Sequence, residues 1–394
     1  MADGVAAAAM ALALPLGSDA AASSGGVVKS PTALKRWRRA LSRMRSAEGY
    51  MPLIVQVGDS KTAGVGTEYG TNQFRYASSI TPALAKILTS RGAPAIAECA
   101  FGSAATGNIP ATLYDPRRTG MVGWSLAYGT GSAGGIGGEL MLSTNTNPAI
   151  FTPSIPVDSC RVLYKQGEGN SATATATVTV DADATVRANL LGGAIPSYTR
   201  SPVVSLGSLA SHAIKINPAG TLPFYFAGIL SWNSTVPAIN IANVGVSGVK
   251  ASYIAANAYL QWLGSLAPDM TIINIGSNDM IVTGPTDITA FTTSVQAVIT
   301  RAKVSGDAII VFPAIGRDAS SVAPGVLVTD AQRVPFRATL VALAAVNDCV
   351  FVDEQALFGG RDVAHADGVF VDDLHESYWA TVVRANNLAS ILLS

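Results

Sequence analysis

Two patterns of hydrophobic residues follow one another along this chain. In residues 50–102, and again in 237–394, short continuous apolar runs alternate with stretches of helical spacing. Such runs are typical of strands buried on both faces. Strands that alternate with helices predict a parallel sheet, because each right-handed crossover lays its helix on a face of the sheet. The expected fold class is therefore α/β, with a parallel sheet between two layers of helices.

The individual elements follow from these runs. Strands are expected at Leu53–Val57, Ala95–Ala100, Ile239–Val244, Met270–Ile275, Ala308–Phe312 and Cys349–Val352. Helices are expected in residues 73–90, Val249–Leu266, 287–304, 331–346 and Ser377–Leu393.

Between the two α/β segments, residues 103–236 are rich in glycine, threonine, serine, asparagine and proline. From its second residue, Ser171–Val180 alternates alanine or valine with threonine, which predicts a half-buried antiparallel strand. Further short apolar runs lie at Cys160–Tyr164, Val203–Leu206 and Leu222–Ile229. We expect an all-β, sandwich-like domain inserted into a discontinuous α/β domain of residues 34–102 and 237–394. Such an insertion costs little chain entropy if its ends lie close together.

The first 33 residues read as a leader or linker. Residues 1–30 are rich in alanine, glycine and serine and lack periodicity. Val5–Leu16 resembles the core of a signal peptide, but it follows Asp3 and no basic segment, so an unstructured or assembly-forming leader is the alternative. The basic stretch Leu34–Arg45 could contact a polyanion or a membrane, or form a solvated helix that packs Trp37 inward.

The charge balance favours the solvated helix and narrows the range of partners. The 394 residues carry 26 basic and 26 acidic side chains, so nucleic acid and anionic membranes are not expected as main partners. No apolar run reaches the roughly 18–20 residues of a membrane span.

Three widely spaced cysteines are not a disulfide framework, and buried thiols are expected. Three histidines without a His/Cys cluster do not predict a zinc site. No metal and no cofactor are expected.

Candidate chemistry begins where the expected strands end. Val57–Ser60 follows the first strand, and the carboxyl ends of parallel strands are where ligand sites form. Ser60 could project its hydroxyl into a cleft, although a serine in this position often only caps a helix. Asp59 is expected at the helix start. Asn243–Gly248 follows another strand, and Gly245 could turn a backbone N–H toward a substrate oxygen, or form an ordinary turn.

Two further segments complete the set. In Gly276–Asp279, the Asn278 amide could donate to a developing oxyanion, or form an Asx turn. In Asp372–His375, the spacing of three lets the carboxylate accept a hydrogen bond from the imidazole, which fixes the tautomer of a general base. Together the four segments supply a nucleophile, a base, an orienting carboxylate and oxyanion donors, which acyl transfer requires.

The order and the residue types of these segments resemble the four sequence motifs, or blocks, of the SGNH (GDSL-type) hydrolases. The resemblance covers about residues 50–102 and 237–394, and implies a three-layer, flavodoxin-like α/β/α hydrolase domain. It implies that Ser60 is the nucleophile, His375 the base and Asp372 its partner. It also implies that the Ser60 and Gly245 amides and the Asn278 side chain form the oxyanion hole. The wide gap between the first two blocks departs from the family pattern, and the β insert explains it.

Several rivals to these residues remain in the sequence. Gly102, after the strand at 95–100, competes with Gly245 for the second block, and the Asn243-x-Gly245 pattern favours the latter. His365 competes with His375 but lies in a glycine-rich loop. Gly129–Gly134 matches G-x-G-x-x-G, yet it follows no clear strand and opens no helix, so a dinucleotide site is not expected. There is no G-x-S-x-G elbow.

The expected function is a serine esterase, with an acylated carbohydrate or small ester as substrate. Carbohydrate binding is one expectation for the insert, because it carries aromatic residues that could stack on sugar rings or fill a sandwich core. No long apolar lid is evident, so an O-acetyl esterase is preferred to a lipase or thioesterase of the same family. The alternative is a phage tail or glycan-binding structural protein with an accessory or inactive hydrolase domain. An extracellular or virion-associated location is favoured, and a homo-oligomer is left open.

Overall fold

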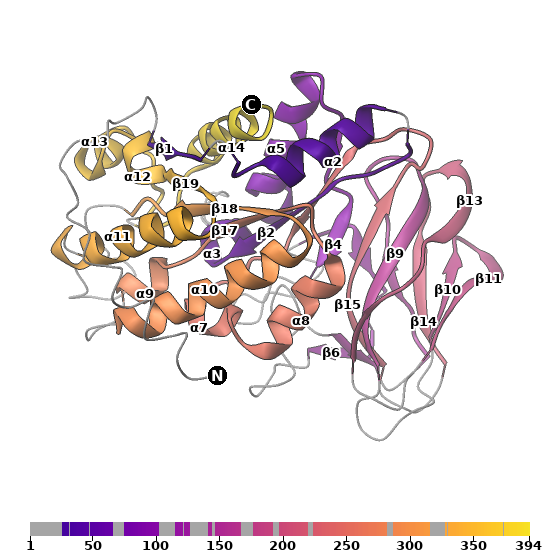
Figure 1. The fold of residues 1–394 in the computed structure, drawn as a ribbon. Helices are drawn as coiled ribbons and strands as arrows, with labels where there is room; N and C mark the ends of the chain where they lie inside the picture. The colour runs from indigo at the N-terminus through magenta and orange to yellow at the C-terminus, as the bar shows by residue number, and fades with distance from the viewer. Residues whose placement is uncertain are drawn as a thin grey trace, which may run out of the picture.

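The computed structural model describes residues 26–30, 32–46, 48–65, 75–101, 115–120, 122–126, 141–143, 146–166, 176–191, 197–219, 224–281, 287–315, 328, 330–372 and 374–394. Figure 1 shows two parts side by side, an α/β part and a β-rich part.

Within these residues, a seven-stranded sheet forms the centre of the α/β part, in the order β1-β19-β18-β17-β2-β16-β3. All strands except β1 run parallel to their neighbours. Their bounds are β1 Val27–Val28, β2 Leu53–Gly58, β3 Ala95–Ile96, β16 Ile239–Asn243, β17 Met270–Asn274, β18 Asp307–Phe312 and β19 Val350–Asp353. Strands β2, β16, β17, β18 and β19 are buried throughout, as their mainly apolar sequences predict.

Helices cover both faces of this sheet, which confirms the three-layer α/β/α fold. Helices α2, α5 and α14 lie on one face, and α8, α10 and α11 lie on the other (Figure 1). The long helices are α2 Lys35–Arg45, α5 Ile80–Ser90, α8 Asn257–Leu266, α10 Ile288–Ser305, α11 Asp330–Val346 and α14 Tyr378–Leu392. The short helices are α3 Ser60–Ala63, α4 Arg75–Ser78, α7 Ala251–Ile254, α9 Ser277–Ile281, α12 Glu354–Leu357 and α13 Arg361–Ala366.

The strand expected at Ala95–Ala100 is divided in two, so that prediction was wrong in part. Its first half, β3, pairs with β16 in the parallel sheet. Its second half, β4 (Cys99–Phe101), pairs with β15 (Phe224–Trp232) of the β-rich part. The chain changes sheets at Glu98, whose carbonyl accepts hydrogen bonds from the backbone N–H and the hydroxyl of Ser231. Apart from Glu98 the run is apolar, and its sequence does not reveal such a change of partner.

The expected leader also ends earlier than residue 33. Val27 and Val28 form β1, which pairs antiparallel with β19 at the edge of the parallel sheet. Helix α2 then buries Trp37, whose indole N–H donates to the Leu392 carbonyl at 2.8 Å. The basic stretch is thus a solvated helix packed on the core, which confirms that interpretation.

The β-rich part consists of two antiparallel sheets with one core between them. The five-stranded sheet has the order β11-β10-β14-β8-β5, and the other has the path β12-β9-β15-β7-β6 with β13 and β4 attached, within the described residues. Their bounds are β5 Arg118–Thr119, β6 Trp124–Leu126, β7 Met141–Ser143, β8 Ala149–Phe151, β9 Val157–Gln166, β10 Ala176–Val180, β11 Asp183–Leu190, β12 Ser197–Arg200, β13 Val204–Ala210 and β14 Ile214–Pro218. Strand β10 alternates buried and half-buried residues, as its alternating sequence predicts. Residues 171–175 of that repeat lie outside the described residues.

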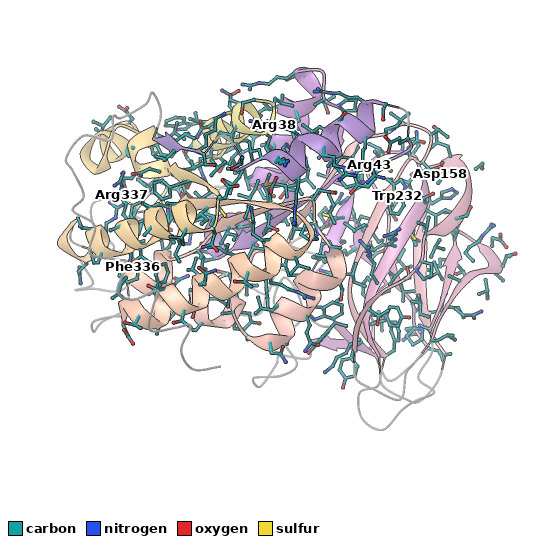
Figure 2. The ribbon with its side chains drawn as sticks, viewed as in Figure 1. Arg38, Arg43, Asp158, Trp232, Phe336 and Arg337 are labelled. Atoms are coloured by element: carbon teal, nitrogen blue, oxygen red, sulfur yellow. The ribbon has the colours of Figure 1, made fainter. Side chains whose placement is uncertain are left out.

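The aromatic residues of the β-rich part serve mainly as its core. Trp124 and Tyr164 are buried among residues of both sheets, and the Tyr164 ring stacks on Phe224 with centroids 5.7 Å apart. Trp232, labelled in Figure 2, is buried where this part meets the α/β core. Tyr198 packs against Trp262 of α8 with ring centroids 4.7 Å apart. These rings are therefore poorly placed to stack on a sugar, and Tyr128 lies outside the described residues.

The remaining sequence expectations concern cysteines and membranes. Cys99, Cys160 and Cys349 are buried free thiols, as expected. Over the part of the chain that the structure describes, no helix has both the length and the apolar character of a membrane span.

Candidate active site

Three of the four predicted segments meet at one edge of the parallel sheet. Strand β2 lies between β16 and β17, and all three run in the same direction. Their carboxyl ends therefore bring Ser60, Gly245 and Asn278 to the same rim of the sheet. Asp59 caps α3, because its carboxylate accepts from the Lys61 N–H at 3.1 Å. Ser60 is thereby the first residue of α3, where its N–H has no intrahelical acceptor.

The fourth segment reaches this rim from the end of the chain. His375 Nε2 lies 3.0 Å from Ser60 Oγ, and His375 Nδ1 lies 2.8 Å from Asp372 Oδ2. The three side chains form one hydrogen-bonded chain, although Ser60 and His375 are 315 positions apart. Ser60 is buried, whereas the His375 and Asp372 side chains are 13% and 35% exposed. The structure thus brings together the hydroxyl, imidazole and carboxylate that the sequence singled out.

Asp372 is held in place by the backbone that follows it. Its Oδ1 accepts the N–H groups of Leu374 at 3.0 Å and of His375 at 2.5 Å. Burial disfavours the charged carboxylate, but these bonds and the His375 imidazole outweigh it and lower the pKa of Asp372 to about 2. The carboxylate is therefore ionised at neutral pH and can stabilise a protonated imidazole.

Gly245 packs so closely on α3 that no side chain fits there. A Cβ at this position would lie 2.6 Å from the Ala63 nitrogen and 2.8 Å from Thr62 Cβ. The N–H of Gly245 donates to Asn243 Oδ1 at 3.0 Å, and the Asn243 amide donates to the Thr62 carbonyl at 2.7 Å. In this conformation the Gly245 N–H already has an acceptor within the protein.

Asn278 is likewise engaged. Its side-chain amide donates to the Val249 carbonyl at 2.9 Å, which uses one of its two N–H bonds and leaves the second as a donor. The structure therefore places Gly245 and Asn278 at the expected rim without showing either one directed at an oxyanion. Gly102, the rival of Gly245, the motif Gly129–Gly134 and the side chain of His365 lie outside the described residues.

A buried ion pair beside Ser60 was missed from the sequence. Lys61 Nζ lies 2.8 Å from Glu376 Oε1, and both side chains are almost fully buried. Lysine is rarely buried, and Lys61 was not among the predicted site residues. The available signal was positional, because Lys61 directly follows Ser60 and Glu376 directly follows His375.

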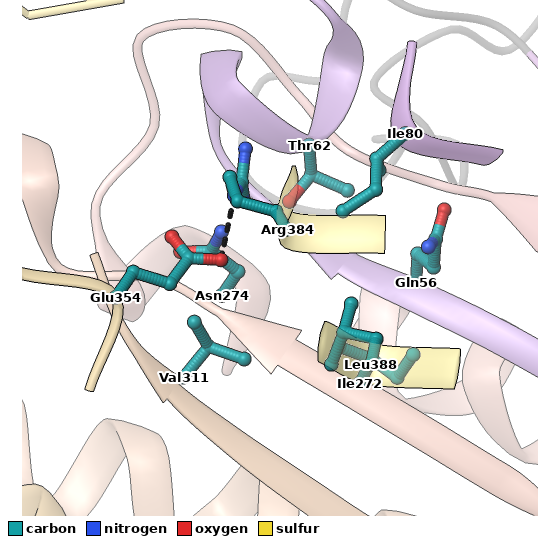
Figure 3. A pocket seen from close by; sticks show the side chains of 9 residues that line it. All are labelled: Gln56, Thr62, Ile80, Ile272, Asn274, Val311, Glu354, Arg384 and Leu388. Atoms are coloured by element: carbon teal, nitrogen blue, oxygen red, sulfur yellow. Dashed lines mark hydrogen bonds and ion pairs between the residues drawn. The ribbon is translucent and has the colours of Figure 1, made fainter. Parts of the chain in front are cut away.

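A small cavity lies behind this rim. Gln56, Thr62, Asn274, Glu354 and Arg384 line it together with apolar side chains (Figure 3). Its volume, about 10 Å³ for the centres of water-sized spheres, is far too small for an ester. The cavity is therefore part of the interior rather than a substrate pocket.

Asp279 makes the stability of the protein depend on pH. Burial raises the pKa of Asp279 to about 6, and the nearby Asp59 adds to this effect. A raised carboxyl pKa gives stability that is fully present below about pH 4 and is lost as the pH rises through about 6. Asp279→Asn keeps an acceptor for the Ala251 N–H and removes the charge. Between pH 4 and pH 8, the free energy of unfolding of the variant relative to wild type should rise by about 1–3 kcal/mol.

Denaturant unfolding at several pH values measures this difference. Asp367→Asn, which changes an exposed carboxylate, is the matched control and should show no trend with pH. A constant difference between Asp279→Asn and wild type at all pH values would contradict the prediction.

Comparison with known proteins confirms the resemblance to the SGNH/GDSL hydrolases. Residues 202–377 match the family model of the GDSL-like Lipase/Acylhydrolase family. This segment contains Gly245, Asn278, Asp372 and His375, whereas Ser60 precedes it on the other side of the β-rich part. Among curated proteins, no sequence matches the chain.

Several solved structures are similar to this chain. One titled "Peptidoglycan O-acetylesterase in action, 5 min" is 16% identical and covers 93% of this chain and 98% of that chain, with a TM-score of 0.69. A mutant of an acetylxylan esterase from Geobacillus stearothermophilus is 17% identical and covers 39% of this chain and 73% of that chain, with a TM-score of 0.32. A lipase/acylhydrolase from Enterococcus faecalis is 15% identical and covers 39% and 77%, with a TM-score of 0.31. The first likeness shows that the fold is shared over nearly the whole chain, including the β-rich part.

Proposed function

Because residues 202–377 carry a GDSL-like acylhydrolase domain, we propose that the chain is a serine esterase that removes O-acetyl groups from a carbohydrate. The observation that carries the reaction type is the hydrogen-bonded chain of Ser60, His375 and Asp372, with contacts of 3.0 and 2.8 Å. A hydroxyl in contact with an imidazole whose other nitrogen faces a carboxylate is the arrangement that activates a serine nucleophile.

In the first half of the reaction, Ser60 Oγ attacks the ester carbonyl while its proton moves to His375 Nε2. The Asp372 carboxylate stabilises the resulting imidazolium through Nδ1. The tetrahedral intermediate collapses as the bond to the leaving alcohol breaks, and His375 gives its proton to that alcohol. The products of this half are a free sugar hydroxyl and an acetyl group on Ser60.

In the second half, water replaces the alcohol. His375 Nε2 accepts a proton from the water as the water oxygen attacks the acetyl carbonyl. His375 then gives this proton to Ser60 Oγ as the bond between Oγ and the acetyl carbon breaks and acetate leaves. We assign stabilisation of both tetrahedral oxyanions to the Ser60 N–H, the second N–H of the Asn278 amide and the Gly245 N–H. The Gly245 N–H would have to be shared with, or released from, Asn243 Oδ1.

Two observations support a carbohydrate substrate. The peptidoglycan O-acetylesterase structure shares its fold with nearly the whole of this chain. In addition, Tyr378 and Trp379 follow His375 by three and four positions, and these residues are 47% and 44% exposed. Exposed aromatic residues in the turn of chain after the base offer an apolar face on which a sugar ring can lie.

A panel of esters tests this proposal. Hydrolysis of p-nitrophenyl acetate, butyrate and decanoate should be fastest for acetate, and acetate should be released from O-acetylated peptidoglycan or acetylated xylan. Comparing the acetate released from the two polysaccharides shows which of them carries the preferred O-acetyl group. Preference for the long acyl chain would identify a lipase instead, and absence of hydrolysis of every ester would contradict the enzyme proposal.

A further inference from the structure

Lys61 connects the helix that carries Ser60 to the backbone on both sides of His375. Its Nζ donates to the backbone carbonyl of Leu374, the residue before His375. The same nitrogen lies 2.8 Å from Oε1 of Glu376, the residue after His375. Lys61 follows Ser60 in α3, so one four-residue helix holds both the hydroxyl and this contact.

The contact continues into a chain of four buried charges. Arg384 of α14 lies between two carboxylates, with Nε 2.6 Å from Glu354 Oε1 and Nη1 3.5 Å from Glu376 Oε2. Figure 3 shows Arg384 and Glu354 facing each other beside the small cavity. Every side chain in this chain of charges is at most 2% exposed. With all four groups ionised, the two positive and two negative charges cancel.

The two nearby positive charges keep Glu376, the carboxylate that faces Lys61, ionised. Burial opposes the charged form of Glu376, but the attraction of Lys61 and Arg384 outweighs it and lowers the pKa of Glu376. Burial raises the pKa of Glu354, at the far end, to about 7. The carboxylate that faces Lys61 is therefore ionised at neutral pH.

Stability alone does not account for burying these charges. Removing four ions from water costs free energy, and apolar side chains of similar volume often give an equally stable or more stable interior. A buried ion pair also fixes geometry, because a charge removed from water is strongly destabilised unless its partners are well placed. The geometry fixed here is the approach of the His375 backbone to α3.

We propose that Lys61 is a positioning residue, which holds the His375 imidazole within hydrogen-bond distance of Ser60 Oγ by binding the backbone before it and the carboxylate after it. The inference rests on the proposed function and adds a residue to it. A displacement of about 1 Å in such a contact can lower a rate a hundredfold. Loss of the Lys61 charge should therefore reduce the reactivity of Ser60 more than it reduces substrate binding.

The variant Lys61→Met tests this inference, with a fluorophosphonate that labels activated serines as the probe. We expect the rate of Ser60 labelling and kcat for p-nitrophenyl acetate to fall about 10- to 100-fold, while KM changes less than about twofold. The double variant Lys61→Met/Glu376→Gln leaves no unpaired carboxylate and carries the test if the single variant fails to fold. It should show the same loss.

Lys303→Met is the matched control. Lys303 Nζ also bridges a carboxylate and a backbone carbonyl, Asp307 Oδ1 at 3.4 Å and Asp348 O at 3.1 Å, outside the predicted site. This control should leave the labelling rate unchanged. The proton resonance of His375 Nδ1–H, which Asp372 shifts downfield, should weaken in the Lys61 variants and persist in the control.

The outcomes separate this inference from the enzyme proposal. A wild-type protein that neither labels nor hydrolyses esters contradicts the proposed function, and the His375 resonance still tests the positioning role. Folded Lys61 variants with wild-type labelling and an unchanged resonance would overturn the role of Lys61.

Discussion

Ser60→Ala should lower kcat/KM for p-nitrophenyl acetate about 10⁴- to 10⁶-fold, the range expected when a serine nucleophile is removed. The variant loses the only atom proposed to form the acyl intermediate, so His375 has no proton to accept from it. Any remaining hydrolysis would come from oxyanion donors that polarise the ester for attack by water. Steady-state kinetics, together with detection of an acyl-enzyme by mass spectrometry in wild type and its absence in the variant, measures the effect.

The fold should survive this substitution, since only one hydroxyl is removed. Ser265→Ala is the matched control, because Ser265 Oγ also donates a hydrogen bond, to the Tyr198 carbonyl at 2.6 Å, where α8 meets β12. The control should keep wild-type kinetics. If Ser60→Ala hydrolyses the ester at the wild-type rate and folds normally, Ser60 is not the nucleophile.

The site could be anticipated because its parts follow strand ends. Parallel strands bring their carboxyl ends to one edge, so the residues after β2, β16 and β17 had to meet there once the strands were identified. The spacing of Asp372 and His375 fixed their mutual contact, since a carboxylate three positions before a histidine reaches its ring across one turn. The 3.0 Å contact between Ser60 and His375, by contrast, could be established from the structure alone.

The errors in the fold lie where pairing partners are decided by distant segments. Val27 and Val28 are too few to show periodicity, and they form β1 only because β19 offers an unpaired edge. The run at Ala95–Ala100 is apolar except for Glu98, and its two halves belong to different sheets. Local sequence encodes the tendency to form a strand, whereas these pairings depend on tertiary contacts.

Hydrogen-bond direction was also beyond the sequence. The motifs placed Gly245 and Asn278 at the rim, but their acceptors, Asn243 Oδ1 and the Val249 carbonyl, depend on how the loops pack. The Lys61–Glu376 ion pair was hidden for a related reason. A lysine is usually solvated, so its burial becomes visible only when its partner, 315 positions away, is located beside it.

The role proposed for Asp372 depends on its charge as well as its position. Its pKa of about 2 means that the carboxylate remains ionised over the whole neutral range. It therefore accepts the Nδ1 proton of His375 and leaves Nε2 free to accept the proton of Ser60. Replacing one carboxylate oxygen by an amide nitrogen reverses this, because the amide donates to Nδ1 and forces the proton onto Nε2.

Asp372→Asn should consequently lower kcat for acetyl ester hydrolysis about 10³- to 10⁴-fold and change KM little. The amide oxygen of the new side chain can still accept hydrogen bonds from the Leu374 and His375 N–H groups, so the loop should keep its shape. Kinetics at pH 7, with Asp367→Asn as a control for an exposed carboxylate nearby, measures the loss. Asp372→Ala, which removes the charge without imposing a tautomer, should lose no more than Asp372→Asn. Wild-type kcat in a folded Asp372→Asn protein would contradict the orienting role, because the Nδ1-protonated tautomer of His375 would then form without this carboxylate.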